Sequence, residues 1–145
     1  FLSYELIVQR LKKNMKKDIH IPEVKDVFIA IIKEYNEIFS CDDWNTYIFN
    51  NKPVELEMVL IVSHGYDEKD QTTLIRKQID KIPANSFAKI EMIQPELFRL
   101  NNEYKVTFFE GNQLMDKTFL FPKESINDEA LEMVEEFGKA GVVAR

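Results

Sequence analysis

Glycine, cysteine and histidine are scarce in this sequence, and each shortage excludes a class of chemistry. The 145 residues include four glycines, one cysteine and two histidines. The glycines stand at positions 65, 111, 138 and 141, a spacing that forms neither G-x-G-x-x-G nor a Walker A loop. Dinucleotide and phosphate binding through those two motifs are therefore excluded.

The single cysteine, Cys41, cannot form an intramolecular disulfide, as is usual for proteins of reducing compartments. The two histidines, His20 and His64, form no H-x-x-x-H pair, and C-x-x-C is absent. Zinc sites need such clusters of ligands. We therefore expect a cytoplasmic protein with no metal and no cofactor.

Basic residues are outnumbered, and no apolar run approaches the length of a membrane-spanning helix. Nineteen Lys and Arg face twenty-five Asp and Glu, which gives a net charge of −6. This balance argues against a nucleic-acid-binding face, because phosphate contacts need concentrated positive charge. We interpret the local basic run Arg10–Lys17 as a solvated helix face, with a patch for an anionic partner as the alternative. No membrane partner is expected.

What the chain does contain is alternating apolar and polar residues, clearest in a hairpin near its end. Residues 102–109 and 114–121 each alternate with period two, and Glu110-Gly111-Asn112-Gln113 between them is typical of a tight turn. The same period predicts strands at 44–50, 54–62 and 87–93. In the second of these, Val54, Leu56, Met58, Leu60 and Val62 are expected to share one face.

Two segments fit a helix as well as a strand. Residues 22–39 carry a helical apolar stripe, but Val27–Ile32 is continuously apolar, which a strand buried on both faces explains better. We predict a strand at 26–33, with a helix at 22–39 packed on an antiparallel sheet as the alternative. We likewise favour a strand at 73–79 over a short helix within 72–82.

Helices are expected at both ends. Residues 3–17 show one apolar stripe at helical spacing. Residues 125–128 resemble a capping box, followed by a helix with Ala130, Leu131, Val134 and Phe137 buried and Gly138 at its end. Met15-Lys16-Lys17 is typical of a bacterial start, so we expect the biological chain to begin at Met15.

About seven short strands predict a mainly β protein, an antiparallel immunoglobulin-like sandwich. The expected domains are a helical extension at 1–18, a sandwich core at 19–125, and a C-terminal helix and tail at 126–145.

Three short segments resemble small bacterial β-rich proteins that have no assigned function. They are Asp43–Asn50, Ser63-His64-Gly65-Tyr66, and Asn102-Glu103-Tyr104 leading into the hairpin. The resemblance spans residues 19–125. It implies a small β-rich domain and adds no chemistry.

Nucleophilic catalysis finds little support in these residues. Nothing places Cys41 beside His64, and Ser63 and His64 would point to opposite faces of a strand. We assign no catalytic residue, and take His64, Tyr66 and Trp44 as candidate binding residues.

The preferred hypothesis is a non-enzymatic protein-interaction module that binds itself or another protein. The alternative is a small hydrolase or ligand-binding protein with a loop-end pocket around His64. That alternative requires a pocket in which His64 contacts Cys41 or a carboxylate.

Overall fold

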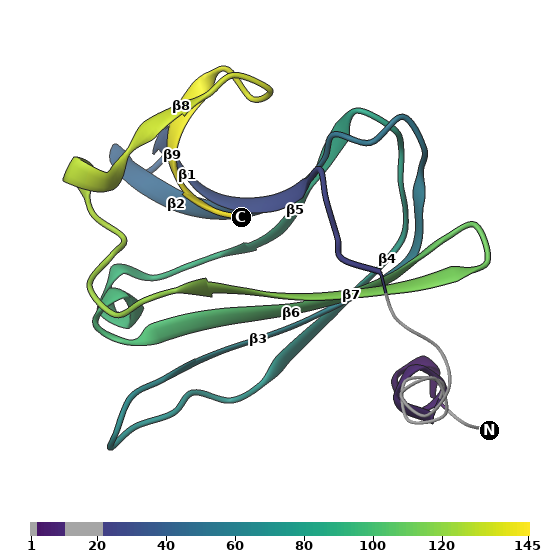
Figure 1. Cartoon of the computed structure of the whole chain (residues 1–145). Helices are drawn as coiled ribbons and strands as arrows, with labels where there is room; N and C mark the ends of the chain where they lie inside the picture. The colour runs from purple at the N-terminus through teal and green to yellow at the C-terminus, as the bar shows by residue number, and fades with distance from the viewer. Residues whose placement is uncertain (1–2, 11–21) are drawn as a thin grey trace.

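Two antiparallel sheets form the body of the molecule, as a computed structural model of residues 3–10 and 22–145 shows (Figure 1). The first sheet has the order β5-β2-β1-β9-β8 and the second has the order β4-β3-β6-β7. The first comprises β1 (Val27–Asn36), β2 (Cys41–Asn50), β5 (Ser86–Met92), β8 (Glu132–Val134) and β9 (Lys139–Ala144). The second comprises β3 (Leu56–Tyr66), β4 (Ile75–Ile82), β6 (Asn101–Glu110) and β7 (Gln113–Phe121). The prediction of a mainly β protein is confirmed.

The first seven strands follow the immunoglobulin pattern with one change. In a constant-type immunoglobulin domain, strands one, two, five and four share one sheet and three, six and seven the other. Here β4 pairs with β3 instead of β5, so it belongs to the second sheet. β8 and β9 then extend the first sheet beyond β1.

Both ambiguous segments are strands. β1 is buried on both faces from Val27 to Ile32, because the second sheet packs on one face and the core continues over the other, where Phe28 stacks on Phe49. A helix would leave half of this apolar run facing water. The helical alternatives for 22–39 and 72–82 are therefore wrong.

The predicted β6–β7 hairpin is confirmed in detail. Glu110 pairs with Gln113, so the loop is Gly111-Asn112, and Gly111 has a φ of +60°. A residue without Cβ adopts this φ at no steric cost.

A bulge in β3 overturns part of the predicted pattern. The pairing with β6 shifts between Glu57 and Leu60, and Met58 has a φ of 49°. One extra residue reverses every side chain beyond it. Leu56 and Ile61 consequently belong to the core, whereas Leu60 lies with Met58 outside it on the opposite face.

The outer face of the second sheet is covered in part by the N-terminal helix. Residues 4–10 are helical; Val8 is buried, and the Tyr4 hydroxyl donates to the Met58 carbonyl. The rest of the predicted helix, with Met15, lies outside the described residues. No helix in the described part of the chain has the length and apolar character needed to cross a membrane.

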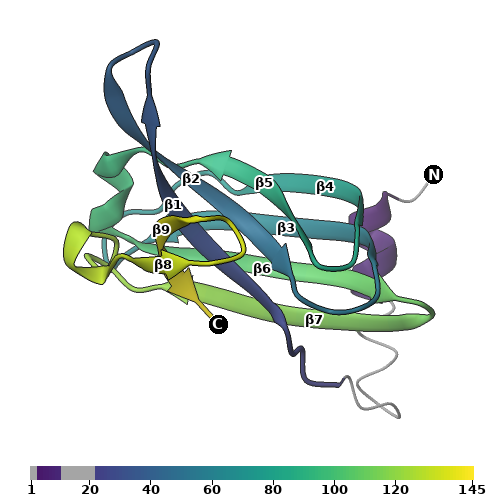
Figure 2. The ribbon, with the colours of Figure 1, turned by 90° about the horizontal axis from the view of Figure 1, so that it is seen from above.

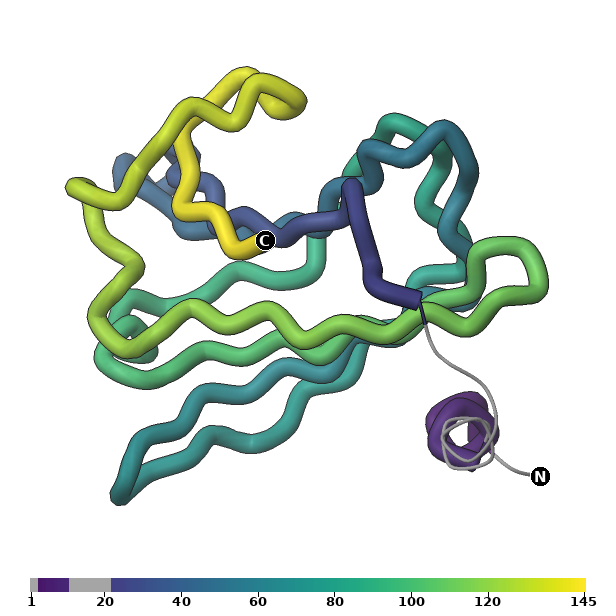
Figure 3. Tube along the Cα trace, in the orientation of Figure 1, coloured from purple at the N-terminus to yellow at the C-terminus, as the bar shows by residue number. Residues whose placement is uncertain are grey.

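The predicted C-terminal helix is wrong. Asn127 caps only a 3₁₀ turn, Asp128–Ala130, and the chain then forms β8 and β9. Val142 pairs with Ile31, so β9 supplies the second neighbour that the buried strand β1 requires. The segment arches over the first sheet (Figure 3) and places Phe137 on the ring of Tyr47, with centroids 4.6 Å apart.

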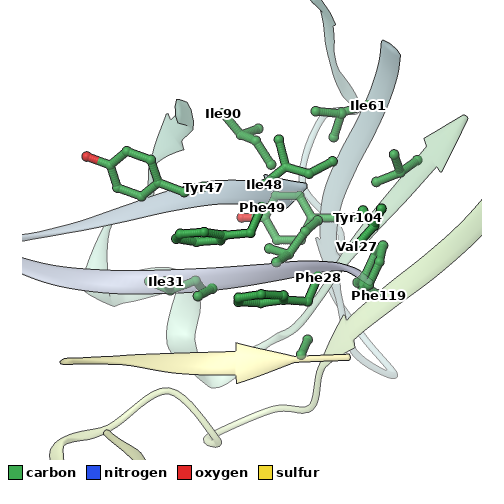
Figure 4. Packing of buried hydrophobic residues seen from close by; sticks show 14 of the residues in the cluster. Val27, Phe28, Ile31, Tyr47, Ile48, Phe49, Ile61, Ile90, Tyr104 and Phe119 are labelled. Carbon is green, nitrogen blue, oxygen red and sulfur yellow. The ribbon is translucent and has the colours of Figure 1, made fainter. Parts of the chain in front are cut away.

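The core lies between the sheets and continues over the outer face of the first. Ile48 and Ile90 of the first sheet meet Ile61, Tyr104 and Phe119 of the second (Figure 4). On the outer face, Phe28 and Phe49 stack with centroids 4.7 Å apart.

The β3 bulge predicts that Met58→Gly stabilises the protein. A left-handed conformation costs a residue with a Cβ about 1–2 kcal/mol, and the entropy loss of glycine offsets about 0.5–1 kcal/mol of that. We expect the free energy of unfolding to rise by up to about 1.5 kcal/mol. The control is Met133→Gly, at a methionine of β8 that is also exposed (63%, against 45% for Met58) but has no positive φ; this variant should have a lower free energy of unfolding. Urea denaturation measures both, and an equal loss in the two variants would contradict the bulge.

Candidate functional site

The structure brings together two of the three predicted binding residues. His64 and Tyr66 follow each other on the outer face of β3, with ring centroids 5.1 Å apart and planes 24° apart. The Tyr66 hydroxyl donates to Glu103 Oε2 at 3.3 Å. Burial, followed by the charge of Glu103, raises the pKa of Tyr66.

The acidic loop beside these rings, residues 67–70, has its negative charge largely balanced by hydrogen bonds and ion pairs. Asp67 Oδ1 accepts hydrogen bonds from the backbone N–H groups of Lys69 and Asp70, at 2.8 and 2.7 Å. These two bonds lower the pKa of Asp67. Arg99 lies 3.3 Å from Asp70 and 3.6 Å from Asp67. The loop is therefore a turn held by hydrogen bonds and ion pairs.

Trp44 lies elsewhere and packs within the fold. It is buried near the start of β2, edge-on to Phe98 at 5.2 Å, with Lys33 Nζ 5.5 Å from its ring centroid. Trp44 therefore stabilises the base of the β1–β2 hairpin and does not join His64.

The structure does not assemble a cysteine–histidine pair. Cys41 is exposed on β2 in the first sheet, whereas His64 is on the second sheet and its side chain faces away from the first. Among residues 3–10 and 22–145, His64 forms no hydrogen bond or ion pair with a carboxylate. In the same ranges, no three His, Cys, Asp or Glu side chains converge as metal ligands.

A pocket of about 240 Å³ opens between the two sheets, and His64 is among the residues that line it. Ile75 of β4, and Ile93 and Leu97 that follow β5, supply apolar walls. Glu91 of β5 brings a carboxyl group into the pocket, opposite Ser63 of β3. We refer to this cavity as the intersheet pocket.

Glu91 points inward because β5 contains a bulge. Thr46 pairs with Glu91 and Tyr47 with Lys89, so Ile90 is an extra residue in the strand. Strict alternation places Glu91 on the solvent side with Lys89, and that expectation is wrong. Ile90 and Glu91 both lie inward, Ile90 in the core and Glu91 in the intersheet pocket. No turn residue in the sequence marks this position.

Hydroxyl groups surround the Glu91 carboxylate. Ser63 and Tyr104 line the same pocket and act on the carboxyl group through their hydroxyls, and the Tyr104 oxygen lies 3.1 Å from Thr46 Oγ1. Burial raises the pKa of Glu91; the two hydroxyls and the charge of Lys77 oppose that rise without cancelling it. The arrangement holds a carboxyl group in a partly desolvated site.

A second feature is the free end of the β1–β2 hairpin, residues 35–42, which we call the hairpin tip. β9 pairs with β1 only over Ile29–Ile32, and β5 pairs with β2 only over Asn45–Asn50. Beyond these ranges the two strands pair with each other alone and project from the body (Figure 2).

The hairpin tip presents large apolar side chains to solvent. Ile38 is 86% exposed, Phe39 75% and Tyr35 63%. Asn36 orders the turn, since its Oδ1 accepts from the N–H groups of Ile38 and Phe39 at 2.9 and 3.2 Å. Its Nδ2 donates to Asp43 Oδ2 at 3.0 Å. The tip is thus an ordered turn.

Comparison with known proteins identifies no relative: no family model, no curated protein and no solved structure matches the chain. The resemblance to small bacterial β-rich proteins stays a prediction.

The Glu91 environment predicts how Glu91→Gln changes stability with pH. Because the folded pKa of Glu91 is raised above 4.5, this group stabilises the fold most below that pH. Its contribution is lost as the pH rises through the folded pKa. Glutamine shows no such loss, so the unfolding free energy of Glu91→Gln minus that of the wild type should increase from pH 4 to pH 7. Chemical denaturation across this range measures the difference. A constant or decreasing difference would show that the carboxyl group is not desolvated.

Proposed function

We propose that this chain is a non-enzymatic protein-interaction module of the cytoplasm that binds a partner protein through its hairpin tip. The observation that carries the proposal is the exposure of Ile38 and Phe39, 86% and 75%, at the end of a hairpin with no other strand neighbour. The free, exposed thiol of Cys41 fits a reducing compartment.

Adjacent exposed Ile and Phe side chains on an ordered turn are typical of binding surfaces. Burying apolar surface yields roughly 25 cal/mol per Å², and a few buried anchor residues, aromatic ones among them, supply most of the energy at many interfaces. The Asn36 hydrogen bonds fix the turn before binding. The entropy cost of ordering it on association is thereby reduced.

Charge around the hairpin tip defines the partner. Glu37, Asp42 and Asp43 flank the apolar residues, and residues 35–43 contain no Lys or Arg. An anionic membrane or a nucleic acid would be repelled. A second copy of this chain, with its net charge of −6, is disfavoured for the same reason. The complementary surface is an apolar pocket with a basic rim on another protein.

The alternative function, ligand binding near His64, is supported by the intersheet pocket and its carboxyl group. The hydrolase version required His64 to contact Cys41 or a carboxylate, and the described residues supply no such contact.

The test of the hairpin tip is Ile38→Ser/Phe39→Ser, with Val54→Ser/Leu120→Ser as a control at exposed apolar residues elsewhere. Both double variants should keep the unfolding free energy within about 0.5 kcal/mol per site, because the side chains are exposed. A photo-crosslinker is attached to Cys41, the only cysteine. It should crosslink the wild type and the control variant to the same partner protein, and it should not crosslink the tip variant to that protein. The partner, once purified, should bind more weakly at high salt.

Two outcomes would overturn this proposal. A loss of more than about 2 kcal/mol in the tip variant would mean that Ile38 and Phe39 belong to the protein's own core. A wild-type dimer in sedimentation equilibrium that the tip variant abolishes would identify a second copy as the partner, against the charge argument.

A further inference from the structure

The intersheet pocket contains a carboxyl group without a cationic partner. Glu91 forms no ion pair within the described ranges 3–10 and 22–145, and Lys77 influences it only through its charge at longer distance. The other titratable side chain that faces it is Tyr104; His64 also lines the pocket, but its side chain is on the outer face of β3. Such a group attracts positive charge.

Its hydrogen-bond capacity is only partly used. An ionised carboxylate offers about four acceptor sites, and the hydroxyls of Ser63 and Tyr104 are its hydrogen-bond donors. Both hydroxyls are on buried residues of neighbouring strands, β3 and β6, and line the pocket beside the carboxylate. The remaining acceptor sites are available to a ligand.

The walls restrict what that ligand can be. Ile75, Ile93 and Leu97 favour an aliphatic chain. A calcium or magnesium ion would find one carboxylate where it needs six or more oxygen ligands. An anion would be repelled by Glu91.

We propose that the intersheet pocket binds a primary alkylammonium group. The –NH₃⁺ group donates to Glu91, and a short aliphatic chain lies along Ile75, Ile93 and Leu97. The volume of about 240 Å³ accommodates a butyl chain or a lysine side chain. This site is independent of the hairpin tip, so either proposal can fail alone.

The experiment is a titration of the purified chain with n-butylammonium chloride, followed by amide NMR shifts. n-Butanol and sodium butyrate serve as matched neutral and anionic ligands. Butylammonium should bind saturably and shift residues 63, 91 and 104, whereas the other two should not. Glu91→Gln should weaken binding at least tenfold. Glu103→Gln, which removes a carboxylate on the outer face of the second sheet, should leave the affinity unchanged.

A second arm separates the sources of the ammonium group. Tighter binding of Nα-acetyl-lysine methylamide than of butylammonium identifies a lysine side chain of a protein, and the reverse identifies a free amine. Either result supports the site. Equal binding of butanol, absence of saturation, or equal losses in Glu91→Gln and Glu103→Gln overturn it.

A measurement on the wild type tests the proposal even if Glu91→Gln does not fold. The ¹³C-detected pKa of the Glu91 carboxyl should fall when butylammonium saturates the protein, because the cation favours the ionised form. An unchanged pKa at saturation would overturn the proposal.

Discussion

The ladder between β1 and β2 is the constraint on which the rest of the structure depends. Its pairing runs unbroken from Val27 with Asn50 to Asn36 with Cys41. The lower half is flanked by β9 and β5 and carries apolar side chains on both faces, so it organises the core on both of its sides. The upper half has no such neighbours. One continuous pairing thus anchors the core and also projects the hairpin tip into solvent.

Period-two patterning predicted the strands well, because strand formation follows from which residues must be buried. The Gly111 turn admitted one good solution, and the continuous apolar run in β1 favoured a strand over the helix that residues 22–39 also fit. The pattern failed at the two bulges, in β3 near Met58 and in β5 at Ile90. A bulge needs no special residue, yet it inverts every later side chain. The sequence therefore located the strands better than it located their faces.

The same limit explains the candidate sites. The proximity of His64 and Tyr66 followed from alternation, whereas the inward turn of Glu91 followed from an insertion that alternation cannot detect. The prediction of a C-terminal helix was wrong because the apolar spacing of that segment also fits strands. The edge of β1 that does not pair with β2 needs a hydrogen-bonding neighbour, and β9 supplies it. Trp44 was a candidate binding residue, but a large aromatic residue is as useful in packing as in binding.

The hairpin tip and the intersheet pocket both arise where strand pairing is incomplete. At the hairpin tip, β1 and β2 extend past their neighbours. At the intersheet pocket, an extra residue in β5 turns a carboxyl group inward. The most direct test of this account is a set of cross-strand nuclear Overhauser effects along β1 and β2. The account predicts contacts that continue out to Tyr35 and Asp42, while Ile38 and Phe39 contact nothing beyond the turn. Contacts from Ile38 or Phe39 to β5 or β9, or a ladder that ends at Ile32, would contradict it.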